Sequence, residues 1–233
     1  MPHHVTNRRR QYPNTEHPQT ADSFFHEAAN ASVYVLGGVT FCVGSVFFLP
    51  QFKAWQWLGA WLFVIGSLLY LFVTIQDLIE VARYARQDQD PRSRNSLEMG
   101  NALLYSLGCV LFVVGSLAFV PAIKSEALGA WAFIIGSLVF MIGAAINVRL
   151  ITRAGNLLML QLFNGIAILF MLGSLLFVVA SVPYLWDHLA DRDKTLLYTY
   201  LASQFIIASV FFFIAGLMNF YRAYIAHQHY CAN

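Results

Sequence analysis

Charged residues are scarce in this 233-residue chain: Asp, Glu, Lys and Arg make up 11% of it, against about a quarter of a typical soluble domain. Histidine is missing from every long apolar run, which excludes a haem held by two histidines inside a membrane. Three cysteines are too few for a disulfide framework, and a formal charge of +2 excludes a polyelectrolyte surface for nucleic acid. The hydrophobic content of 58% instead predicts an integral membrane protein.

Six apolar runs are long enough to cross a bilayer, which takes about 20 residues of helix. None of them contains Asp, Glu, Lys, Arg or His. Uninterrupted apolar runs of this length indicate helices, because spanning β-strands are shorter and alternate in polarity. We therefore predict an all-α membrane protein with six transmembrane helices, at residues 28–52, 54–76, 99–123, 127–148, 154–186 and 195–221.

The spacing of charges divides the chain into hairpins and polar segments. We expect a polar tail, three two-helix hairpins, a charged linker between the first two hairpins, and a short final tail. Their predicted boundaries are 1–27 for the first tail, 28–80 for the first hairpin, 81–98 for the linker, 99–153 for the second hairpin, 154–225 for the third and 226–233 for the last tail.

Lys and Arg are distributed unevenly between the two sides that this topology defines. Ten arginines lie on the side of the two termini, whereas Lys53, Lys124, Arg192 and Lys194 lie on the other. Cytoplasmic loops carry the excess of Lys and Arg. The count predicts that both termini are cytoplasmic.

Internal repeats carry the most information in this sequence. The pattern G-x3-F-x2-G-S-x2-[FY] occurs in each of the first four runs, and the last two keep weaker versions with all serines retained. Alternate runs are the most similar, so the repeating unit is a hairpin used three times, with the third copy degenerate. The glycines of the pattern are Gly37, Gly44, Gly59, Gly66, Gly108, Gly115, Gly129, Gly136 and, in the third copy, Gly173.

Antiparallel pairing places these glycines opposite one another. If the first hairpin turns between Pro50 and Lys53, Gly37 faces Gly66 and Gly44 faces Gly59. The second hairpin gives the same result about a turn near residue 122. Small residues allow helix backbones to approach closely in lipid, so the glycines predict tight helix packing. The neighbouring serines are expected to bond their own helix or an adjacent one, and a pore lined by six serines is the alternative.

One polar position recurs near the cytoplasmic end of each even-numbered span. It holds Asp77 in the first hairpin, Asn147 in the second and Asn219 in the third, each eleven residues beyond the second small residue of its pattern. Around a common axis these side chains would form a ring, which is the best candidate for a ligand or ion site. The alternative is that they mark where helices emerge into water, because polar residues gather at span ends.

No motif for catalysis, nucleotide binding or a resident metal is present. His227, His229 and Cys231 offer fewer than four ligands on a terminal tail, so we expect no metal site there. The sequence predicts a protein without enzymatic activity and without a cofactor.

At its glycine and phenylalanine positions the chain resembles the YrhK-domain family of small bacterial membrane proteins. The resemblance rests on the repeated F-x-x-G-S-x-x-F helices, seen best between Gly108 and Phe140. It implies a bacterial inner-membrane protein and carries no activity or site residue with it. We expect the protein to act in the lipid bilayer through helix packing, or through a membrane-protein partner or a second copy. A small transporter or channel with a cytoplasm-facing polar site is the alternative.

Overall fold

The computed structural model describes residues 21–87, 93–150, 157–186 and 191–231, and this part of the chain is helical apart from short turns. Six of its helices are long and apolar enough to cross a membrane. The prediction of an all-α protein with six transmembrane helices is therefore confirmed. The long helices are α2 (Ala21–Val46), α3 (Gln56–Gln87), α4 (Ser93–Ala118), α5 (Glu126–Leu150), α6 (Leu157–Ser181) and α7 (Asp191–Cys231); short 3₁₀ helices are η1 (Pro50–Trp55) and η2 (Val182–Leu185).

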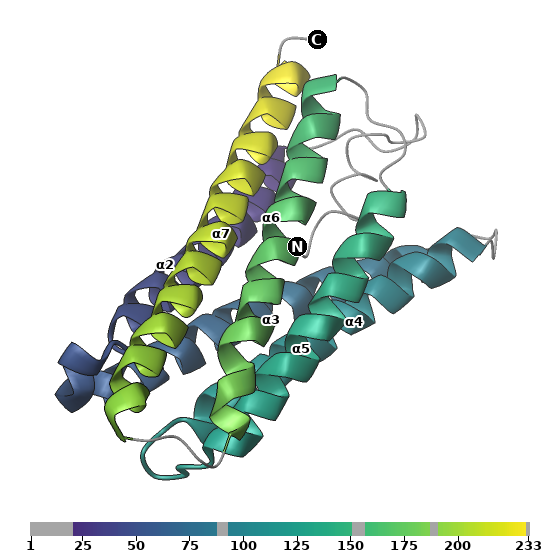
Figure 1. Cartoon of the computed structure of the whole chain (residues 1–233). Coiled ribbons are helices and arrows are strands. Elements are labelled where there is room, and N and C mark those ends of the chain that lie inside the picture. The colour runs from purple at the N-terminus through teal and green to yellow at the C-terminus, as the bar shows by residue number, and fades with distance from the viewer. Residues whose placement is uncertain (1–20, 88–92, 151–156, 187–190, 232–233) are drawn as a thin grey trace.

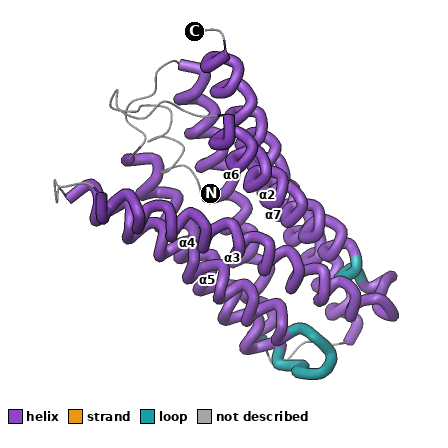
Figure 2. The backbone as a smooth tube through the Cα atoms, turned by 180° about the vertical axis from the view of Figure 1, so that it is seen from behind, coloured by secondary structure: helices purple, strands orange, loops and turns teal. Residues whose placement is uncertain are grey.

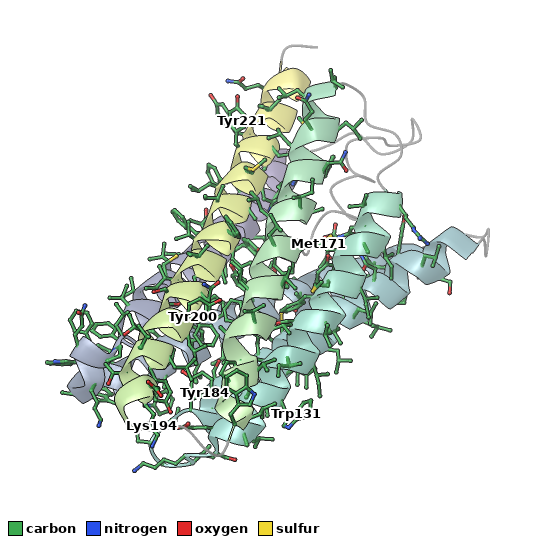
Figure 3. The ribbon with its side chains drawn as sticks, in the orientation of Figure 1. Trp131, Met171, Tyr184, Lys194, Tyr200 and Tyr221 are labelled. Atoms are coloured by element: carbon green, nitrogen blue, oxygen red, sulfur yellow. The ribbon has the colours of Figure 1, made fainter. Side chains whose placement is uncertain are left out.

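The six helices form a closed ring (Figures 1 and 2). Each long helix packs against its neighbours in the sequence, and α7 returns to pack against α2. We call the end where α2 begins and α7 finishes the terminal end, and the opposite one the loop end. Figure 3 shows Trp131 and Lys194 near the loop end and Tyr221 toward the terminal end. Because successive helices alternate in direction, the ring consists of three hairpins that all point the same way.

Prolines mark the turns at the loop end. Pro50 begins η1 shortly after α2 ends at Val46, and Pro183 lies in η2 directly after α6. Proline fixes its own φ and lacks an N–H donor, so it favours the end of a helix. The turn after α4 contains Pro121 and is closed by the Ser125 N–H, which donates to the Ala118 carbonyl at 3.0 Å.

Glycines lie where the two helices of the first hairpin meet. A Cβ atom on Gly59 would lie 2.8 Å from the carbonyl oxygen of Gly44, and one on Gly66 would lie 3.2 Å from that of Gly37. Both distances are shorter than an ordinary van der Waals contact. The backbones of α2 and α3 can therefore approach this closely only while these positions lack a side chain.

The second and third hairpins have contacts of the same kind. A Cβ atom on Gly129 would lie 3.2 Å from the carbonyl oxygen of Gly115, and one on Gly136 would lie 3.0 Å from the ring of Phe112. In the third hairpin a Cβ atom on Gly173 would lie 3.0 Å from the Ala208 carbonyl oxygen. Glycine on one helix thus makes room for backbone or for an aromatic ring of the other.

Aromatic side chains fill the centre of the ring. Twelve of them form six pairs spaced seven residues apart, one pair on each long helix or just beyond its end, and all belong to one packed cluster. Edge-to-face and offset arrangements predominate, as aromatic quadrupoles favour. The twelve side chains are Phe41, Phe48, Phe63, Tyr70, Phe112, Phe119, Phe133, Phe140, Phe170, Phe177, Phe205 and Phe212.

Serines lie at contacts between hairpins. The hydroxyls of Ser45 on α2 and Ser209 on α7 are 3.0 Å apart, and those of Ser67 on α3 and Ser116 on α4 are 3.1 Å apart. The Ser45 and Ser209 hydroxyls also lie 2.7 Å from carbonyls four residues earlier in their own helices, so one serine can donate to its helix while the other donates to it. These serines therefore join neighbouring hairpins, while aromatic rings occupy the axis on which a serine-lined pore would have to lie.

Replacement of Gly66 or Gly136 by Leu should separate two helices of a hairpin. The new side chain would meet the partner helix, and overpacking costs about 1–3 kcal/mol or more. We expect a lower thermal unfolding temperature in detergent for both variants. Gly100→Leu is the control, because a Cβ atom at Gly100 has no heavy atom within 4 Å. Equal unfolding temperatures for all three variants and the unmodified protein would show that the glycine stripe faces lipid.

Candidate functional site

Polar side chains form a layer inside the ring at its terminal end. Asp77 on α3, Asn147 on α5 and Asn219 on α7 occupy one repeat position, and they are 4%, 1% and 7% exposed. All three therefore point into the protein rather than into water or lipid. Burial of a carboxylate and two amides in a membrane span requires partners for their polar atoms.

Asn147 belongs to a hydrogen-bonded chain between α4 and α5. The side-chain amide of Asn101 donates to the Asn147 side-chain oxygen at 2.5 Å, and the Asn147 amide donates to the Tyr105 hydroxyl at 3.0 Å. We call these three residues the asparagine cluster. Asn101 and Tyr105 lie one turn apart on α4, so a single helical face provides both partners of Asn147.

Asp77 lies next to the asparagine cluster. Its buried carboxylate lies within electrostatic range of Tyr105. The repeat explains this position, because Asn30 and Asp77 in the first hairpin correspond to Asn101 and Asn147 in the second. The first two hairpins thus bring equivalent polar groups into one region of the terminal end.

Asn219 belongs to a second group, which we call the arginine cluster. Arg222 on α7 is completely buried, and its Nη2 donates to Oε1 of Glu27 on α2 at 2.8 Å. Its Nε donates to the Asn219 side-chain oxygen at 3.1 Å. The guanidinium carbon lies 5.2 Å from the ring centre of Phe163 on α6, a cation–π contact. Residues from three helices therefore hold one arginine.

The structure thus divides the three predicted site residues between two groups. Asn147 donates to Tyr105 and Asp77 lies within electrostatic range of the same residue, whereas Asn219 accepts from Arg222. The described residues include no group of three or more His, Cys, Asp and Glu side chains that could hold a metal ion. Hydroxyl, amide and carboxylate groups in the asparagine cluster and Asp77 are suited to hydrogen bonding and to cation binding.

Sequence reasoning missed the arginine cluster, because it assigned Glu27 to the first tail and Arg222 to the segment after the last span. A signal was present in the repeat: Glu27 and Glu98 have the same register as Asn30 and Asn101. Arg222 also follows Asn219 by three residues, which places both on one helical face. The His227 and Cys231 side chains of the tail lie outside the described residues.

The fold and these contacts define a multi-pass membrane protein built from repeated two-helix hairpins. Residues 25–81 and 95–151 each match the family described as YrhK-like protein. The chain therefore carries two YrhK-like units in tandem, as the sequence resemblance predicted. The third hairpin, α6 and α7, follows the matched segments. No curated protein and no solved structure matches the chain.

Removal of one partner from the arginine cluster should destabilise the protein strongly. Arg222→Met leaves Glu27 buried without its ion-pair partner, and loss of one partner of a buried pair costs about 3–5 kcal/mol. Glu27→Leu should have a similar effect, and the double variant should cost less than the sum of the two. The measurement is unfolding in detergent, with Arg149→Gln as an exposed-arginine control. Additive effects in the double variant would show that the two residues act independently.

Proposed function

We propose that the protein is a sealed helical ring that acts by association with another membrane protein or a second copy, rather than by moving a solute along its axis. One observation carries the proposal: the Phe177 ring of α6 contacts an aromatic ring from every other long helix. The centroid distances are 6.4 Å to Phe41, 6.2 Å to Phe63, 5.1 Å to Phe112, 6.0 Å to Phe133, 5.3 Å to Phe205 and 5.4 Å to Phe212.

An aromatic centre opposes transport through the axis. Transfer of an ion or a polar solute into apolar surroundings without compensating partners costs several kcal/mol. The polar layer lies at the terminal end, whereas Phe177 and its neighbours fill the bundle between that layer and the loop end. This packing supports a structural role over a conducting one.

The outer surface supports association within the bilayer. Large apolar side chains on every long helix face outward, among them Leu36, Ile65, Leu107, Ile135 and Ile168. In lipid these side chains contact acyl chains or the apolar face of another transmembrane helix. The lipid bilayer is therefore one partner of this surface, and a protein partner would bind it by replacing lipid.

We further propose a bacterial inner-membrane location with both termini in the cytoplasm, on the strength of the arginine excess at the terminal end. Cysteines introduced at Gln51 and Ala122 should react with a membrane-impermeant maleimide added from outside. A cysteine at Gln89, between the first two hairpins, should react only after the membrane is opened. Labelling of Gln89→Cys in intact cells would invert the proposed orientation.

A small transporter or channel with a cytoplasm-facing polar site is the second candidate. Burial of Asp77 and Asn147 beside Tyr105 favours it, because a carboxylate that only marked a span end would lie in water. In this alternative Asp77 supplies negative charge and selects cations or protonated ligands.

Flux into proteoliposomes distinguishes the two candidates. The sealed ring should show no flux above empty liposomes for protons, sodium, potassium or small amines. Flux of any of these solutes that depends on the protein would contradict the proposed function. In the same proteoliposomes, energy transfer between donor-labelled and acceptor-labelled copies should persist as lipid is added, if the partner is a second copy.

Asp77→Asn tests the role of the carboxylate in any flux that is found. The change keeps size and hydrogen-bonding capacity while it removes the charge. On the transporter alternative, flux should fall while the protein stays folded. Unchanged flux would exclude Asp77 from the pathway. An unchanged unfolding temperature together with absent flux in both proteins would leave the sealed ring as the better description.

A further inference from the structure

The ring contains three contacts between hairpins, which we call seams: α7 with α2, α3 with α4, and α5 with α6. One serine from each helix lies on its seam, at equivalent repeat positions. The Ser45–Ser209 pair bridges the first of these seams and the Ser67–Ser116 pair bridges the second. By the repeat, Ser137 on α5 and Ser174 on α6 are the corresponding pair of the third seam.

Small residues continue along the third seam on both sides of these serines. In an antiparallel pair of helices, the residue numbers of facing residues have a constant sum. If Ser137 faces Ser174, that sum is 311, so Ala130 faces Ser181 and Ala144 faces Ala167. All six side chains are fully buried. Their seven-residue spacing keeps them on one stripe of each helix. The third seam is therefore built from alanine and serine side chains.

The third seam differs from the others in its hydrogen bonding. The hydroxyls of Ser137, Ser174 and Ser181 are buried and have no hydrogen-bond partner among the described residues. Ser45 and Ser209, by contrast, each have two acceptors within reach for their single proton, the other serine hydroxyl at 3.0 Å and a carbonyl of their own helix at 2.7 Å. A buried hydroxyl without a partner loses its hydration and gains nothing in exchange. Three such groups disfavour the closed form of the α5–α6 seam.

Additional contacts strengthen the other two seams. The buried Glu27–Arg222 ion pair joins α2 to α7, and a Cβ atom on Gly38 would lie 2.9 Å from the Phe213 Cα atom. Across the α3–α4 seam the Ser106 hydroxyl lies 3.4 Å from the Thr74 carbonyl, while it also reaches the Ala102 carbonyl of its own helix at 3.0 Å. Figures 1 and 2 show α2, α6 and α7 diverging as a group from α3, α4 and α5 toward the terminal end, so of the three seams only α5–α6 lies between the two groups.

We infer that the ring opens laterally between α5 and α6, with the third hairpin pivoting on its seam with α2. When this seam loosens, the Ser137 and Ser174 hydroxyls leave a closed contact in which they have no hydrogen-bond partner. Opening also brings the aromatic interior beside Phe133 and Phe170 into contact with the bilayer. A lipid-soluble molecule could then reach the sealed interior from the side, which goes beyond the proposed association.

Three alanines provide matched probes of the seams. Ala60, Ala130 and Ala202 occupy one repeat position on α3, α5 and α7, each seven residues before its serine and on the same stripe. Their exposed fractions are 1%, 0% and 1%. We would place a single cysteine at each position in a protein whose native Cys42, Cys109 and Cys231 are replaced by alanine. Alkylation by N-ethylmaleimide in liposomes is then measured relative to the rate after denaturation.

Ala130→Cys should react about tenfold faster than Ala60→Cys and Ala202→Cys, since one unsatisfied hydroxyl corresponds to about 1.4 kcal/mol of opening free energy. Addition of Ser137→Ala and Ser174→Ala should slow the reaction at position 130, because methyl groups need no hydrogen bond in the closed seam. Ser67→Ala should accelerate the reaction at position 60, because it breaks a bonded pair.

A second pair of probes covers the case in which Ala130→Cys does not fold. Ala167 on α6 and the native Cys109 on α4 are equivalent in the repeat and face the α5–α6 and α3–α4 seams. Ala167→Cys, in a protein without Cys42, Cys109 and Cys231, should react faster than Cys109 in a protein without Cys42 and Cys231. Equal rates at positions 60, 130 and 202, or at 109 and 167, would overturn the inference, as would a rate at position 130 unaffected by the two serine changes.

Discussion

Helices inside a bilayer gain little from burying apolar surface, because lipid tails are as apolar as the side chains they replace. Close approach and hydrogen bonding must therefore hold this ring together. Glycines permit the approach within hairpins, and serines with other small residues permit it between hairpins. The aromatic centre depends on both kinds of contact. Its ring centroids can lie 5 to 6 Å apart only when all six helices pack close to the axis.

One short motif encodes all three contacts of a helix. Successive residues of a helix are rotated by about 100°, so the serine of each G-S pair lies about 100° from the glycine. The phenylalanine three residues before the glycine projects between them, about 60° from one and 40° from the other. A helix in a six-membered ring meets its two neighbours about 120° apart, with the axis between them. The sequence pattern of Phe41, Gly44 and Ser45 therefore has the angular layout that such a ring needs.

Spans and hairpin repeats could be predicted from the sequence because apolar length and seven-residue spacing are local properties. The partner of each serine could not, since the pairing of Ser45 with Ser209 depends on how the three hairpins close into a ring. Arg222 was misread for a related reason. A charged residue at the end of an apolar run normally indicates the point where the helix emerges into water. Arg222 lies inside the protein instead, because the carboxylate of Glu27 on another helix pairs with it there. The asparagine cluster beside Asp77 and the arginine cluster that contains Asn219 likewise depend on neighbouring helices, which the spacing of residues in the sequence does not identify.

The ion pair between the first and last helices has a consequence for synthesis of the chain. Glu27 and Arg222 are separated by 195 residues, which a ribosome adds in roughly 10 to 40 s. Throughout that interval the carboxylate at the start of α2 has no arginine to meet. An insertion intermediate must therefore keep Glu27 at the membrane surface or in contact with another component. Only the arrival of α7 completes the ring, so a chain released early would expose this defect to quality-control proteases.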